Sequence, residues 1–67
     1  MINKIRIDPL LVRIEQAADM LALSRSRVYE LLHAGEISSV KAGRSRRVIV
    51  DSIYEFIARL QEEQRQN

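Results

Sequence analysis

Several residue types that carry chemistry are absent from this sequence or nearly so. Its 67 residues include no cysteine, one histidine, one proline and two glycines. Without cysteine there is neither a disulfide nor a thiolate metal site, and nothing argues for an oxidising compartment. The histidine, His33, has no partner set for a metal, so we expect it to be a surface residue.

Catalytic constellations are missing as well. There is no glycine-rich phosphate loop, and no nucleophile or base is arranged near the outward carboxylates Glu15, Asp19, Glu62 and Glu63. We therefore expect a protein that is not an enzyme, with no catalytic residue, metal or cofactor. No apolar run approaches the roughly 20 residues that span a bilayer, and the start, MINKIRIDPL, lacks the apolar core of a signal peptide. These absences predict a cytoplasmic protein without membrane contact.

The composition that remains is that of one small globular domain. Hydrophobic residues make up 46% of the chain and charged residues 30%, which argues against wholesale disorder. The net charge of +2 is unevenly distributed, because residues 24–47 hold six basic and two acidic side chains while the rest holds five and seven. Clustered positive charge of this kind is typical of a protein that binds a polyanion.

The stretch SRSRVYELLHA, residues 24–34, predicts a recognition helix. Ser24 is a good N-cap, because its hydroxyl can accept a backbone N–H of the first turn. Val28, Leu31 and Leu32 recur at helical spacing and form one apolar stripe. The outward face carries serine, arginine, tyrosine and glutamate, which suit the base edges and phosphates of a nucleic acid groove.

A second helix precedes this one. Ile14, Ala17, Ala18 and Leu21 predict a helix over residues 14–21, and the connection to Ser24 is so short that the two helices must cross steeply, as in a helix-turn-helix. We expect Leu23 to be the buried residue of the turn.

A hairpin follows the recognition helix. Gly35 can end that helix in a left-handed conformation. Residues 37–41 and 46–50 read as strands joined by the turn 42–45. The tip, KAGRSRR, carries four cations in seven residues, which predicts a basic wing that reaches phosphates or the minor groove.

The last helix is expected to belong to the core. Asp51 is its expected N-cap, and Ile53, Phe56, Ile57 and Leu60 form its apolar stripe. We expect Leu31 and Phe56 to be buried and to face each other. Residues 62–67 (EEQRQN), together with the preceding Gln61, have no apolar anchor and are expected to fray. Residues 1–9 read as either an edge strand or a flexible arm.

These motifs, in this order, resemble the excisionase family of small DNA-binding proteins. The resemblance is carried by residues 14–21 (IEQAADML), 23–29 (LSRSRVY), 35–37 (GEI) and 40–44 (VKAGR) with Arg46 and Arg47, within about residues 10–57. It implies an α+β fold: a small winged helix-turn-helix of the mercury-resistance-regulator (MerR) type, with three helices and a two-stranded hairpin wing, over residues 10–61.

The resemblance also implies a function and a set of DNA-binding residues. Family excisionases bend attachment-site DNA and direct an integrase toward excision of a mobile element, so double-stranded DNA, an integrase or recombinase, and further copies bound cooperatively are the implied partners. The helix equivalent to residues 25–33 enters the major groove, and the wing contacts the minor groove or backbone. By position, the DNA-binding residues are Ser24, Arg25, Ser26, Arg27, Tyr29 and Glu30 on the helix and Lys41, Gly43, Arg44, Ser45, Arg46 and Arg47 on the wing.

Three positions depart from the family pattern. Arg13 stands where a Thr or Ser cap is usual, which should weaken the first cap, and Ala22 replaces the common glycine of the turn. Glu30 stands where a cation is frequent, so it either reads a cytosine amino group or pairs with Arg27. Tyr29 is similarly open: either it faces the groove with the other DNA-binding residues, or its ring packs at the edge of the apolar stripe with its hydroxyl on a phosphate.

Two other functions remain compatible with the sequence. The first is a small winged-helix transcriptional regulator of a phage or mobile element, which shares the domain. The second is an adaptor that grips a protein partner through the last helix. The absence of a long dimerising helix favours the excisionase, and we expect a monomer that becomes cooperative only on tandem DNA sites.

Overall fold

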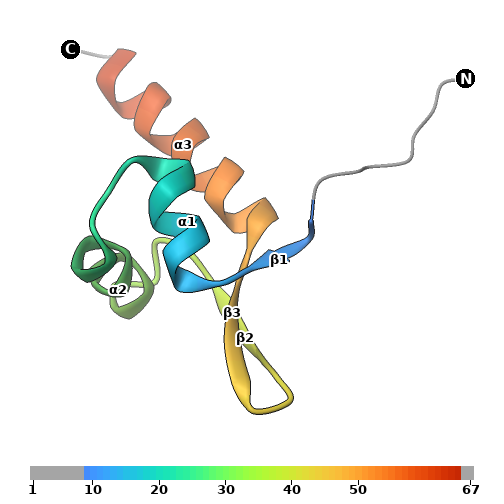
Figure 1. Ribbon diagram of the computed structural model, residues 1–67. Coiled ribbons are helices and arrows are strands. Elements are labelled where there is room, and N and C mark those ends of the chain that lie inside the picture. Colours follow the sequence, from blue (N-terminus) through green and yellow to red (C-terminus); the bar gives the residue numbers. More distant parts are fainter. Residues whose placement is uncertain (1–8, 66–67) are drawn as a thin grey trace, which may run out of the picture.

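The computed structural model describes residues 9–65, which form three helices and one small antiparallel sheet (Figure 1). The strands are β1 (Leu11–Val12), β2 (Ser39–Ala42) and β3 (Ser45–Ile49), and the helices are α1 (Ile14–Leu21), α2 (Arg25–His33) and α3 (Val50–Arg65). This is the predicted winged helix-turn-helix. The expectation for residues 1–8, arm or edge strand, falls outside the described residues.

The sheet has one more strand than the sequence predicts. Its order is β1-β3-β2, with Leu11 opposite Ile49 and Val12 opposite Val48. A two-residue strand gives too short an alternation to be read from sequence. Its effect is to hold the segment before α1 against the base of the hairpin, where the Val50 N–H donates to the Leu10 carbonyl at 3.0 Å.

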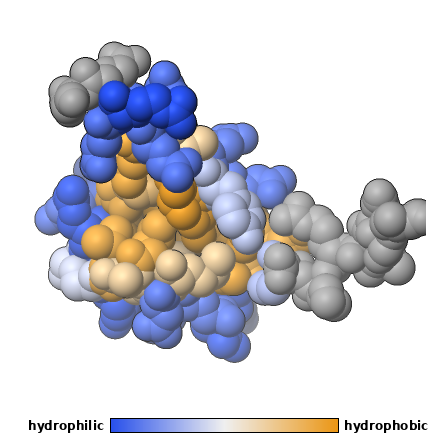
Figure 2. Space-filling view, turned by 90° about the horizontal axis from the view of Figure 1, so that it is seen from above, coloured by the Kyte–Doolittle hydropathy of each residue, from blue (hydrophilic) through white to orange (hydrophobic). Residues whose placement is uncertain are grey.

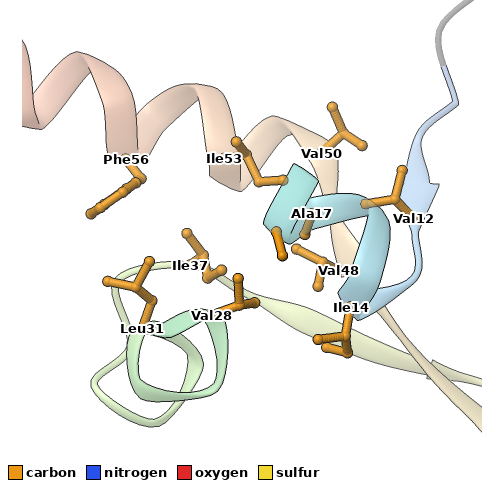
Figure 3. Packing of buried hydrophobic residues seen from close by; sticks show 11 residues of the cluster. Val12, Ile14, Ala17, Val28, Leu31, Ile37, Val48, Val50, Ile53 and Phe56 are labelled. Atoms are coloured by element: carbon orange, nitrogen blue, oxygen red, sulfur yellow. The ribbon is translucent and has the colours of Figure 1, made fainter. Parts of the chain in front are cut away.

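The core is built from one apolar face of each helix together with the base of the sheet (Figure 3). Val28, Val48, Val50 and Ile53 are the largest side chains that are fully buried. Ala17 is also fully buried, and a side chain this small lets α1 approach its neighbours closely. Leu31 and Phe56 are buried as predicted, and Figure 3 shows them pointing toward one another from α2 and α3.

Two predictions about single residues were wrong. Leu23 is 36% exposed, because its side chain lines an open groove whose other walls are residues of α1, α2 and α3. Asp51 is not at the N-cap position of α3, because the helix begins at Val50 directly after β3. Asp51 lies within the first turn, where a carboxylate is still favourable beside the positive end of the helix dipole.

The end of α3 differs from expectation, whereas the start of α1 agrees with it, since Arg13 was expected to be a weak cap. The helix α3 continues to Arg65, into the segment that the sequence predicts to fray, and an ion pair joins Arg65 to Glu62 at 3.7 Å. At the start of α1, the Arg13 side chain accepts no hydrogen bond. The side-chain Oε1 of Gln16 accepts the Arg13 main-chain N–H at 3.0 Å instead, which supplies half of a capping box.

Both helices of the helix-turn-helix end in the same motif. The Leu23 N–H donates to Ala18 and the Ala22 N–H to Asp19, while the Glu36 N–H donates to Leu31 and the Gly35 N–H to Leu32. These are the two bonds of a Schellman motif, which places one residue in the left-handed region. That residue is Gly35 (φ 77°) after α2 but Ala22 (φ 57°) after α1.

Ala22→Gly is therefore expected to stabilise the protein. A Cβ in the left-handed region costs about 1–2 kcal/mol, which the substitution removes. Glycine also makes the unfolded chain more flexible, and this cancels about 0.5–1 kcal/mol of the gain. The net gain of about 1 kcal/mol should raise the melting temperature by about 4–8 °C in thermal denaturation. The matched control is Gly35→Ala, where a Cβ would meet nothing within 4 Å, and which should lower the melting temperature. An unchanged or lower melting temperature in Ala22→Gly would contradict the argument.

Candidate nucleic-acid interface

The outer face of α2 is fully available to a partner. The Ser24 Oγ accepts the Arg27 N–H at 3.1 Å, so the predicted N-cap is in place. Val28 and Leu31 are buried and anchor the inner face. The exposed residues of the helix and its cap are those that the sequence assigned to DNA, together with His33: Ser24, Arg25, Ser26, Arg27, Tyr29 and Glu30.

The first-turn arginine Arg27 is held by Glu30. Its Nη1 lies 2.7 Å from the Glu30 Oε1, with both side chains more than half exposed. Of the two roles left open for Glu30, pairing with Arg27 is thus observed. A guanidinium has five N–H donors, so this contact leaves the other terminal nitrogen and Nε available to a ligand.

Arg25 lies between an acid and an aromatic ring. Its Nη2 is 3.7 Å from the Glu15 Oε2 of α1, and its guanidinium carbon is 5.9 Å from the centre of the Tyr29 ring. This distance falls within the range of cation–π contacts. Tyr29 is 50% exposed, so its ring packs beside Arg25 rather than into the apolar stripe, and its hydroxyl remains available to a phosphate.

The hairpin of β2 and β3 forms the wing, which Figure 1 shows projecting beyond the helices. Its turn is shorter than the predicted turn 42–45, because the strands extend to Ala42 and Ser45. These two residues pair with each other, and only Gly43 and Arg44 lie between them. Gly43 has a φ of 67° and Arg44 has no positive φ, which is the pattern of a type II′ turn. Gly43 therefore has a structural role, because it allows the two-residue turn that presents Arg44.

The wing cations divide between two faces of the hairpin. Lys41 lies directly opposite Arg46, on the face that carries the buried Val48 at its base, and the Arg46 Nη1 donates to the Ser39 Oγ at 3.1 Å. Arg47 and Ser45 lie on the other face, where Arg47 is half-buried and donates to the Arg46 carbonyl at 3.3 Å. Lys41, Arg44 and Arg46 are consequently the wing cations best placed to act together.

The pair Lys41–Arg46 is unfavourable in the isolated protein. Like charges directly opposite each other in an antiparallel sheet are destabilising, because their Cβ atoms lie only about 4.5–5.5 Å apart. Within residues 9–65, no carboxylate forms an ion pair with Lys41, Arg44 or Arg46. A phosphate backbone would supply the missing negative charge.

The sequence analysis did not identify two residues that hold arginines of this interface. Ser39 holds Arg46, and it could have been found because it lies two positions before Lys41 and therefore on the same strand face. Glu15 holds Arg25 across the helix pair, and no sequence signal points to it. Among residues 9–65, no group of three or more histidines and carboxylates lies together as a metal site would require. No helix in the same range is long and apolar enough to cross a membrane.

The wing geometry makes a prediction about affinity. Arg44→Ala should weaken binding to all DNA sequences alike and lower the slope of log K against log salt by about 0.9, the value of one phosphate contact. Fluorescence anisotropy with two unrelated duplexes over a salt series measures both quantities. Arg65→Ala, which removes an equal charge at the far end of α3, is the control and should leave the slope unchanged. A loss confined to one duplex would instead assign base reading to the wing.

Comparison with known proteins bears on this interface as a whole. A family model described as "Helix-turn-helix domain" matches residues 11–61, which include α1, α2 and the wing. The chain is also similar to a protein described as a probable excisionase from Saccharopolyspora erythraea, with 43% identity over 51 residues. The aligned region is 76% of this chain and 52% of the relative, so the chain spans about half the length of that protein.

Proposed function

Because the chain belongs to the helix-turn-helix domain family, we propose that it binds double-stranded DNA sequence-specifically as an excisionase. In this proposal α2 lies in the major groove and the wing lies on the adjacent backbone or minor groove. The observation that carries DNA binding is a group of three wing cations, Lys41 and Arg46 on one face of the hairpin and Arg44 in its turn, which have no ion-pair partner within residues 9–65. The similarity to a probable excisionase supports the choice of role.

The division of labour follows from the side chains. Arg27, held by Glu30 in the first turn of α2, is the base reader, because a guanidinium matches guanine O6 and N7 as a bidentate donor. The side chains of Ser24 and Ser26 are too short to reach across the floor of the groove, so they contact only phosphates or bases that lie close to the helix. Arg25 and Tyr29 act together on the backbone, as do Lys41, Arg44 and Arg46. Ser45 and Arg47, on the opposite face of the hairpin, contribute less.

In the proposed activity the protein changes the shape of DNA rather than its covalent structure. A domain that contacts a major groove and the neighbouring minor groove or backbone gains contact when the duplex curves toward it, which offsets part of the bending energy. Bent attachment-site DNA would bring recombinase sites together and so favour excision by an integrase. No residue is assigned a catalytic role.

The test is a gel assay on attachment-site DNA of the host element with the site placed at different positions in fragments of equal length. An excisionase gives a specific complex whose mobility depends on the position of the site, because the DNA is bent, and it stimulates excision when the integrase is added. A straight complex without effect on recombination would favour a transcriptional regulator with the same domain. Absence of any DNA complex would overturn both roles.

A further inference from the structure

The connector between the recognition helix and the wing is short and well bonded. It comprises residues 36–38, between the end of α2 and the start of β2. The Glu36 N–H donates to the Leu31 carbonyl at 2.9 Å, and the Ser38 carbonyl accepts the Ile49 N–H at 2.9 Å. Ile37, between them, is buried. Any change in this connector therefore changes the position of the wing relative to α2.

Ser52 of α3 binds one end of the connector. Within residues 9–65 it is the one polar side chain that is buried. Its Oγ accepts the Ser38 N–H at 2.9 Å and lies 2.7 Å from the Ile49 carbonyl, to which it donates. One hydroxyl thus joins the bases of both wing strands to the first turn of α3.

Arg59 of the same helix binds the other end. Its Nη2 donates to the Glu36 carbonyl at 2.6 Å and lies 3.3 Å from the Glu36 Oε1. The main-chain bond matters most here, because a charged donor to a carbonyl is stronger than a neutral pair. Ser52 and Arg59 lie two turns apart on α3 and so hold the connector at two points.

We propose that Ser52 and Arg59 form a clamp that fixes the wing at the angle to α2 needed for simultaneous contact with DNA. Both are positioning residues, and neither contacts DNA. The proposal rests on the proposed function only for its DNA readout. The helix α3 thereby acquires a role in binding beyond its contribution to the core.

The first test measures the wing without DNA. Ser52→Ala leaves the Ser38 N–H without its acceptor, so amide hydrogen exchange should become about tenfold faster or more at Ser38 and also at Ile49. Ser38→Ala is the matched control, because it removes a neighbouring hydroxyl and keeps the main-chain groups that Ser52 contacts. Faster exchange at Ser38 with no change at Ile49 would show that the clamp does not hold the wing, and would overturn the proposal.

The second test measures DNA binding under conditions in which circular dichroism shows each variant to be folded. Ser52→Ala should weaken duplex binding about fivefold at 0.15 M salt, the worth of one phosphate contact with a slope of 0.9. In a background lacking Lys41, Arg44 and Arg46 through alanine substitution, Ser52→Ala should change binding by less than about twofold, because the wing has then already lost its main contacts. Equal losses in both backgrounds would make Ser52 a stability residue only. Ser52→Thr should restore binding, because its Oγ can make the same bond to the carbonyl three residues earlier.

The Arg59 side chain is about half exposed, so replacing it does not disturb the core. Arg59→Ala should reproduce the wing-dependent loss of affinity, whereas Arg65→Ala, which removes the same charge from α3 without touching the connector, should not. If the two substitutions weakened DNA binding equally, Arg59 would act only through its positive charge, and its part in the clamp would be overturned. If the parent protein binds no duplex at all, the proposed function fails, while the hydrogen-exchange test of the clamp still stands.

Discussion

Replacing Phe56 with alanine is expected to remove about 3–5 kcal/mol from the unfolding free energy, by leaving a cavity between α2 and α3. Phe56 is 8% exposed and belongs to the same buried cluster as Leu31, which Figure 3 shows opposite it. A domain of this size buries a small core, and its total stability lies near the lower end of about 5–15 kcal/mol. The variant should therefore be largely unfolded at physiological temperature.

Urea denaturation followed by circular dichroism measures this loss. Leu31→Ala should cost about 2–5 kcal/mol for the same reason. Ile57→Ala is the control on the neighbouring position, because Ile57 is 37% exposed and lies at the rim of the groove between α1 and α3. A Phe56→Ala variant that melts with the parent would show that α2 and α3 are not packed through this residue.

Arg27→Ala is expected to flatten the preference for the cognate site. A bidentate arginine–guanine contact is worth about 1–3 kcal/mol of discrimination against a wrong base pair. The 2.7 Å bond to Glu30 holds the guanidinium before binding, which reduces the side-chain entropy lost in the complex. Non-specific affinity should stay within a few-fold of the parent, because base contacts contribute little to it.

Competition titrations with cognate and scrambled duplexes at one fixed salt concentration test this assignment. Arg27→Lys should recover only part of the specificity, because an ammonium lacks the planar fork of a guanidinium. Arg25→Ala is the matched control on the same helix turn and should weaken both duplexes alike. An equal loss on both duplexes in Arg27→Ala would make Arg27 a phosphate contact, and base reading would pass to Tyr29 or Glu30.

Much of the fold could be predicted because its signals are local. The cap at Ser24, the apolar spacing of α2 and the glycines at positions 35 and 43 each specify a backbone conformation within a few residues, and the structure contains all of them. The resemblance to excisionases predicted the helices and the wing in the right order, and the comparisons with known proteins confirm the family. The Arg27–Glu30 pair was also within reach, because it depends only on helical spacing.

What could not be predicted depends on contacts between distant segments. The strand β1 exists because Leu11 and Val12 meet β3 across the sheet, and two residues leave no periodicity to read. Leu23 was expected to be the buried residue of the turn, but its side chain is 36% exposed in a groove lined by residues of all three helices. Figure 2 shows hydrophobic side chains exposed on the face of the molecule seen from above. Strand alternation alone separates Arg46 from Arg47, but the placement of Lys41 on the face of Arg46 followed only from the observed register, since a shift of one residue exchanges the two faces.

The arrangement of the wing cations on the hairpin also could not be derived from the sequence alone. From the sequence, four wing cations form one basic cluster, whereas the register places Lys41 and Arg46 on one face, Arg47 on the other and Arg44 in the turn. We therefore expect three of these cations, Lys41, Arg44 and Arg46, rather than four, to meet one DNA surface. This number sets the salt dependence of binding.

The salt dependence of duplex binding tests the central claim most directly. If Lys41, Arg44 and Arg46 each neutralise a phosphate, log K should fall against log salt with a slope of about −2.7 or steeper, a loss of about fortyfold between 50 and 200 mM salt. Anisotropy titrations of the unmodified protein with a labelled duplex give this slope. A slope near zero, or no binding at the lowest salt, would contradict the account and leave the protein without a DNA-binding role.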